Sequence, residues 1–133
     1  MRGRKPDAIT PGSLDRVPPA PSWLSKHAKA EWKRVAPILT LERKVLTEAD
    51  LGTLESYCTA TGTVRECQKT LNLDGLIIQS PNGPKRHPAL GIQNAAMTTA
   101  RLCAGELGLT PVSRSRPSIR ESPDDDDSAD LGF

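Results

Sequence analysis

The chain has 133 residues, a formal net charge of +2 and an apolar fraction of 36%, which is enough for one small domain. Its three cysteines form no Cys-x-x-Cys pair and no Cys/His cluster, which argues against a zinc site and suits a reducing compartment. The sequence shows no signal-peptide pattern and no apolar run of about 18 residues. We therefore expect a protein of the cytoplasm that is neither secreted nor inserted in a membrane.

The charges are segregated along the chain. Residues 1–21 carry four cations and two anions, residues 22–110 carry eleven and eight, and residues 111–133 carry three and six. The first segment is rich in proline, and the last contains the acidic run Asp124–Asp127. This pattern predicts a disordered basic arm (1–21), one helical domain (22–110) and a disordered tail that ends acidic (111–133).

The arm opens with Arg2-Gly3-Arg4-Lys5-Pro6. Arginine side chains on an extended arm can enter a narrow DNA minor groove, where they are favoured over lysine. Taken alone, these five residues fit an ordinary basic terminus better.

The first helix is expected to begin after Ser25, which is a good N-cap residue. Ala28, Trp32, Val35 and Leu39 follow at spacings of three and four, which place them on one face. Three lysines lie on the other side: Lys26, Lys29 and Lys33. Pro37 should end this helix near Ala36 or kink it there.

A second helix of roughly 25 residues is predicted after Thr47-Glu48-Ala49-Asp50, which has the pattern of a capping box. Its apolar face is thin, with Thr and Cys between the leucines, and Gly62 costs up to ~1 kcal/mol relative to alanine. We expect Asp74-Gly75 to close the helix. The predicted seam is Leu51, Leu54, Cys58, Thr61, Val64, Cys67 and Leu71.

A short strand and turn are expected at residues 76–84, because β-branched residues are followed by a Pro-Asn-Gly-Pro run. The cluster Lys85-Arg86-His87 comes next, and Pro88 suits the first position of a third helix that ends at Gly108. The predicted seam of this helix is Ala89, Ile92, Ala96, Thr99, Cys103 and Leu107.

These elements predict a mainly α fold: a helical domain whose long helical hairpin is joined by a short extended or β-turn segment, between a disordered basic N-terminal arm and an acidic C-terminal tail. A domain of about 90 residues with thin apolar seams gains from burial against other copies. The sequence therefore favours a homo-oligomer.

Read in order, these segments resemble the small subunit family of bacteriophage terminases, over residues 1 to about 116. No single string decides the match, but the ordered set with its spacing is specific. The segments are Arg2–Pro6, Pro21–Ser25, Glu31-Trp32, Ala36-Pro37, Leu39, Leu46–Asp50, Tyr57-Cys58, Ser80–Gly83, His87–Ala89 and Leu107–Pro111.

The resemblance implies a non-enzymatic factor that initiates DNA packaging. It implies a ring that recognises concatemeric viral double-stranded DNA and delivers it to the large terminase subunit, which carries the ATPase and nuclease. It also implies action in the host cell cytoplasm and absence from the mature virion. The acidic run lies beyond the shared region and inherits no role.

Many copies of a weak cationic arm on one ring would bind DNA well. The residues expected to contact DNA are Arg2, Arg4, Lys5, Lys26, Lys29, Lys33, Arg34, Lys85 and Arg86. For the helix lysines a solvated face is equally compatible, and for Lys85, Arg86 and His87 a soluble loop is. The residues expected at the oligomer interface are Trp32, Leu51, Leu54, Tyr57, Ile92 and Ala96, of which Trp32 and Tyr57 also fit a core position.

No catalytic motif, cofactor site or metal site is recognised in the sequence. The alternative function is a small helical DNA-binding transcription regulator or adaptor that acts as a dimer. A third is a scaffold without affinity for DNA. The mass of the native assembly separates the first two, and DNA binding at low salt identifies the third.

Overall fold

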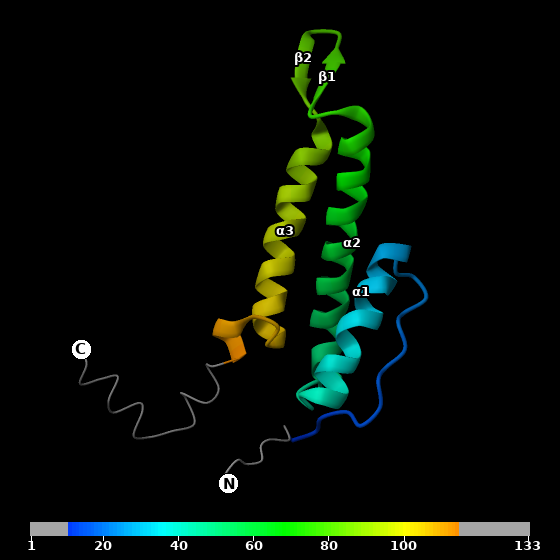
Figure 1. The fold of residues 1–133 in the computed structure, drawn as a ribbon, viewed down its shortest axis with the longest axis vertical. Coiled ribbons are helices and arrows are strands. Elements are labelled where there is room, and N and C mark those ends of the chain that lie inside the picture. The colour runs from blue at the N-terminus through cyan, green and yellow to red at the C-terminus, as the bar shows by residue number, and fades with distance from the viewer. Residues whose placement is uncertain (1–10, 115–133) are drawn as a thin grey trace, which may run out of the picture.

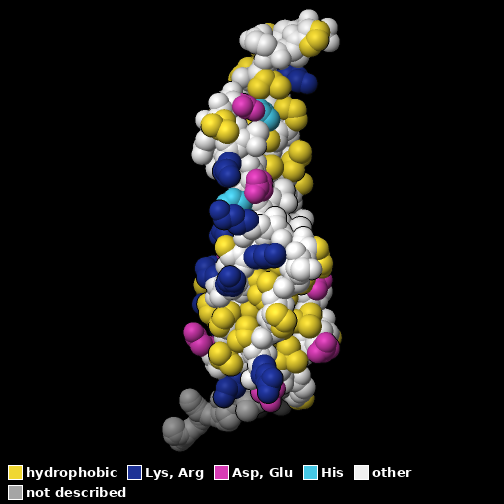
Figure 2. Space-filling model, turned by 90° about the vertical axis from the view of Figure 1, so that its right-hand side faces the viewer, with side chains coloured by type: hydrophobic (Ala, Val, Ile, Leu, Met, Phe, Trp, Pro, Cys, Tyr) yellow, Lys and Arg dark blue, Asp and Glu magenta, His cyan; other side chains and the backbone are white. Residues whose placement is uncertain are grey.

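The computed structural model describes residues 11–114 and shows a long helical hairpin with a shorter helix against its lower half (Figure 1). The element order is α1 (Lys26–Pro37), α2 (Leu51–Asp74), β1 (Ile77–Ser80), β2 (Gly83–Arg86) and α3 (Pro88–Leu107). Between α1 and α2 lie a π-helical turn, Ile38–Glu42, and a 3-10 turn, Glu48–Asp50. Seen from the side, the molecule is narrow and elongated (Figure 2). The expected mainly α fold with a helical hairpin is confirmed.

Local sequence signals set most helix ends. The side chain of Ser25 accepts a hydrogen bond of 3.2 Å from the backbone N–H of Ala28 at the start of α1. Ahead of α2, Asp50 accepts hydrogen bonds from the backbone N–H and the hydroxyl of Thr47, at 3.0 and 2.9 Å. Gly108 adopts the left-handed conformation (φ +77°) that ends α3. These helix boundaries were predicted correctly.

As expected, the α-helix ends close to Ala36, at Pro37, and the helical path then widens. It continues through Pro37 into the π-helical turn, where the N–H of Arg43 donates to the carbonyl of Ile38 at 2.9 Å. Proline has no N–H to donate to the carbonyl four residues back, so the carbonyl of Lys33 cannot receive the regular α-helical hydrogen bond from Pro37. The wider π turn takes over at this point.

The tip of the hairpin is a two-stranded antiparallel ribbon. Ile77 pairs with Arg86 and Ser80 with Gly83, and Gly83 supplies the positive φ of +109° at the turn. Pro88 is the first residue of α3, as expected, and the residue before it, His87, is the N-cap. The imidazole Nδ1 accepts from the N–H of Ala89 at 3.0 Å, and Nε2 lies 2.9 Å from a carboxylate oxygen of Asp74. His87 thus joins the end of α2 to the start of α3.

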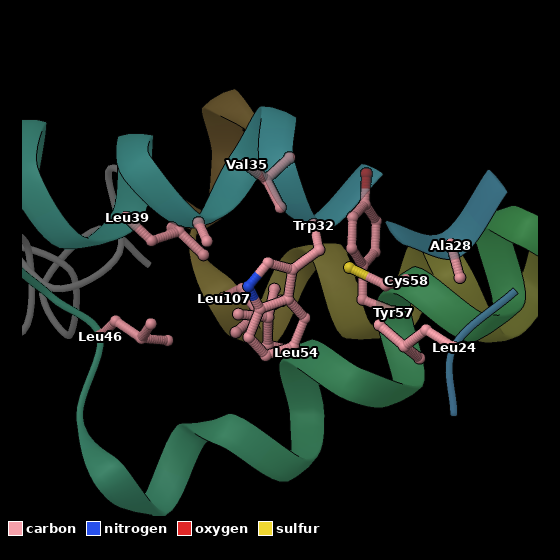
Figure 3. Close-up of a cluster of buried hydrophobic side chains, with 11 residues drawn as sticks. Leu24, Ala28, Trp32, Val35, Leu39, Leu46, Leu54, Tyr57, Cys58 and Leu107 are labelled. Atoms are coloured by element: carbon pink, nitrogen blue, oxygen red, sulfur yellow. The ribbon is translucent and has the colours of Figure 1, made fainter. Parts of the chain in front are cut away.

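The main core lies where α1 crosses the lower part of the hairpin. Figure 3 shows the Trp32 indole within this cluster, together with Leu54 of α2 and Leu107 of α3. A smaller cluster nearer the tip contains Cys67, Leu71 and Ala89. Gly62 marks the close crossing of α1 and α2, because a Cβ built there would lie 3.0 Å from the backbone nitrogen of Ala28.

The seam of α3 was predicted correctly at Ala89, Cys103 and Leu107 but one position out of phase at Ile92 and Thr99. Ile92 is exposed, whereas Gln93 is buried and donates to the carbonyl of Val64 and the side-chain oxygen of Gln68, at 3.2 and 3.0 Å. Thr99 is exposed as well, and Ala100 packs against the core instead. A polar residue can occupy the inner face here because its amide finds partners on α2.

Two segments assigned to the disordered ends have a defined path. In the arm, the Leu14 N–H donates to the carbonyl of Leu46 at 2.8 Å, and the Trp32 indole N–H donates to the carbonyl of Pro18 at 2.8 Å. In the tail, residues 111–114 form a helical turn, and Ser113 is buried. Residues 11–21 are thus joined to α1 and to the segment before α2, and Ser113 is hydrogen-bonded to Thr110 within its own turn. The remaining residues expected to be disordered, 1–10 and 115–133, lie outside the described residues.

Candidate nucleic-acid interface

A lysine face lies on the side of α1 that points away from the core. Lys26, Lys29 and Lys33 are spaced by three and four residues, and with Ala30 they line a shallow surface depression. Figure 2 shows that Lys and Arg side chains gather at mid-height on the side of the molecule that carries α1. The predicted grouping of these three lysines on one helix face is seen in the structure.

Glu31 lies on the opposite, inner side of α1, where its side chain is only 1% exposed. Its carboxylate accepts two hydrogen bonds from Arg34, through Nε at 3.1 Å and Nη2 at 2.5 Å. It also accepts one from Arg65 Nη2 at 3.0 Å and one from the Tyr57 hydroxyl at 2.5 Å. One buried carboxylate therefore ties α1 to two residues of α2.

These contacts determine which groups carry charge. Burial alone would raise the pKa of Glu31, but hydrogen bonds from Arg34 and Tyr57 and the positive charges of Arg34 and Arg65 outweigh it, so the pKa is lowered. Burial, followed by the neighbouring Glu31 carboxylate, raises the pKa of Tyr57. Burial likewise raises the pKa of the Cys58 thiol to about 12. At neutral pH the cluster holds an ionised carboxylate, two guanidinium cations, a neutral phenol and a neutral thiol.

The predicted DNA-contacting residues fall into separate places. Arg34 is engaged with Glu31, although 60% of its side chain is exposed. Lys85 and Arg86 are exposed on β2, at the hairpin tip and away from α1 (Figure 1). Arg2, Arg4 and Lys5 lie outside the described residues. Of the predicted DNA-contacting residues within 11–114, the structure groups Lys26, Lys29 and Lys33 on one face of α1. It also shows a further exposed cation, on α2, that the sequence analysis did not single out.

The missed residue is Arg65, which lies on α2 and is 34 positions from its partner Glu31. A signal for this pairing was present in the sequence. Glu31 falls between Ala28, Trp32 and Val35, all of which are buried. An acidic residue at a core position needs a cationic partner, because an unpaired buried charge is too costly. The sequence could not say which cation would supply it.

The predicted interface residues are divided between the chain's own core and its surface. Trp32, Leu54 and Tyr57 are buried in the core of the single chain (Figure 3). Leu51 packs against that core. Side chains buried in this way have little surface left for a second copy. Ile92 is exposed and Ala96 is partly exposed, so both remain available for such a contact.

Other large apolar side chains are exposed along the hairpin. They are Leu73, Leu76, Ile77, Met97 and Leu102. Trp23 is also exposed and lines a groove between α2 and α3 together with Ala60, Ala95 and Ala96.

Within the described residues no group of three or more His, Cys, Asp and Glu side chains is placed to hold a metal ion. No helix between residues 11 and 114 is both long enough and apolar enough to cross a bilayer.

The structure is that of a small helical protein with cations clustered on one helix and apolar side chains exposed along a hairpin. Residues 28–124 match the family model described as "Phage terminase, small subunit", and the chain belongs to that family. A search of curated proteins and a search of solved structures gave no match. Family membership gives the protein a role in phage DNA packaging, and small subunits of this family are generally non-catalytic.

Proposed function

We propose that this protein initiates packaging without catalysing a reaction. Copies of the chain assemble into a ring, bind concatemeric viral double-stranded DNA and deliver it to the ATPase and nuclease of the large terminase subunit in the host cytoplasm. The observation that carries this proposal is the separation of two exposed surfaces on one elongated chain. The hairpin offers apolar side chains to other copies, and α1 offers cations to DNA.

The apolar surface is large enough to matter for assembly. Leu73 is 85% exposed, and Leu76, Ile77, Ile92 and Leu102 are each more than half exposed. Burial of one such side chain contributes about 1.5–3 kcal/mol, so burial of any four of these five would contribute on the order of 6–12 kcal/mol. This is comparable to the roughly 4–15 kcal/mol of freedom lost on association. Self-association through the hairpin is therefore energetically reasonable.

The basic surface becomes effective when it is repeated. Lys26, Lys29 and Lys33 of one chain offer at most three phosphate contacts, but a ring presents several such faces to one duplex. The second cluster, Lys85 and Arg86, would be repeated in the same way at the hairpin tips. We include Arg2, Arg4 and Lys5 in the proposed DNA contacts on their sequence alone.

Native mass spectrometry of the full chain, with and without duplex DNA, tests both parts. We expect a closed assembly of many subunits that binds DNA with an affinity that falls steeply with salt. Ile92→Asp with Leu102→Asp should yield smaller species, because charges would be placed on the proposed contact surface. Leu41→Asp is the control, since Leu41 is exposed but lies outside the hairpin.

Two results would replace the proposal. A monomer or dimer at every concentration would favour the dimeric DNA-binding regulator. A ring that fails to shift DNA even at low salt would favour a scaffold.

A further inference from the structure

We propose that Glu31, Arg34 and Arg65 form a preorganised binding site for a phosphate of the DNA backbone. This inference rests on the proposed DNA binding and adds a residue from α2 to the interface. The site lies on the junction of α1 and α2, and it is built by one buried carboxylate that holds two partly exposed guanidinium groups.

The charge balance points to an anionic ligand. One arginine is enough to neutralise Glu31, and Arg34 already does so with two hydrogen bonds, while the Tyr57 hydroxyl supplies a further donor. Arg65 is therefore in excess of what the buried carboxylate needs. With Arg65 included, the three side chains Glu31, Arg34 and Arg65 carry a net charge of +1, and 43% of the Arg65 side chain is exposed to solvent. A cation that served only to satisfy Glu31 would not need to leave positive charge at the surface.

The hydrogen-bond geometry leaves donors for a ligand. Arg34 donates to the Glu31 carboxylate through Nε and Nη2, and Arg65 donates to it through Nη2. Among the described residues, no hydrogen-bond acceptor is found for Nη1 of Arg34 or for Nε and Nη1 of Arg65. These groups match the acceptor oxygens of a phosphodiester, for which guanidinium groups are well suited.

Preorganisation distinguishes this pair from the lysines. A lysine on a free surface loses side-chain entropy when it contacts a phosphate. Both guanidinium groups are already held by the Glu31 carboxylate, so they lose less on binding. Arg34 follows Lys33 in the sequence of α1, and Arg65 adds a cation from α2.

The test compares Arg65→Gln with Lys69→Gln in DNA binding by the full chain at several salt concentrations. Both variants lose one exposed positive charge from α2, one turn apart, and Lys69 does not contact Glu31. If Arg65 contacts a phosphate, the slope of log affinity against log salt falls by about 0.9 per binding chain for Arg65→Gln only. Equal slopes for Arg65→Gln and the wild type, or equal losses in both variants, would overturn the proposal.

A footprint on the wild-type protein gives the same answer without a variant that could unfold. Arginine-selective modification with phenylglyoxal, mapped by mass spectrometry, should show protection of Arg34 and Arg65 by a duplex. Arg101 on α3 should stay reactive. Unprotected Arg34 and Arg65 in a DNA-bound sample would overturn the inference and leave the proposed function standing. Absence of any DNA binding by the wild type would instead refute the proposed function.

Discussion

The most informative perturbation is Glu31→Gln, because it keeps the size of a buried side chain and removes its charge. The carboxylate accepts four hydrogen bonds from Arg34, Arg65 and Tyr57. An amide nitrogen cannot accept, so at least one donor would meet another donor. Arg34 and Arg65 would also lose their ionic partner.

The cost can be estimated from burial. Removal of one partner of a fully buried ion pair costs about 3–5 kcal/mol. Here the side chains of Arg34 and Arg65 are 60% and 43% exposed and can hydrogen-bond to water instead. Only the buried Tyr57 hydroxyl would be left without a hydrogen-bond acceptor. We therefore expect the low end, about 3 kcal/mol. For a domain of this size that lowers the melting temperature on the order of 15 °C.

Thermal and urea unfolding followed by circular dichroism would measure this loss, at one fixed protein concentration because self-association shifts apparent stability. Glu42→Gln is the control, because Glu42 is exposed and should change stability by less than about 0.5 kcal/mol. Tyr57→Phe should cost about 1 kcal/mol, and the double variant should lose less than the sum of the two. A loss below about 1 kcal/mol for Glu31→Gln would refute the view that this carboxylate ties α1 to α2.

Two further outcomes follow from the same contacts. The pKa of Glu31 is lowered in the folded protein, so the unfolded chain takes up the proton first and stability should fall as the pH drops below the ordinary value of 4.5. Urea midpoints between pH 6 and pH 3 should fall more for the wild type than for Glu31→Gln, and parallel profiles would contradict this. At the crossing of α1 and α2, Gly62→Ala should destabilise by about 1–2 kcal/mol, because crowding against Ala28 outweighs the ~1 kcal/mol gain in helix propensity. Gly52→Ala, whose new Cβ would have no neighbour within 4 Å, should be neutral or stabilising, and equal behaviour of the two variants would show that the crossing is not tight.

The sequence alone determined most of the helix boundaries. Ser25, the Thr47 and Asp50 pair, Pro88 and Gly108 act on backbone groups within a few residues, so their effect could be read without the fold. The family was also recognisable from ordered local segments, and the match over residues 28–124 confirms it.

Tertiary structure decided which side chains face one another. The seam of α3 includes Gln93 rather than Ile92 because the amide finds acceptors on α2, and no local pattern contains that information. Residues 11–21 follow a fixed path because they form hydrogen bonds with α1 and with the segment before α2. Arg65 joins Glu31 across 34 positions of sequence for the same reason. Periodicity fixes the faces of a helix, whereas the partner of each face depends on how the helices pack.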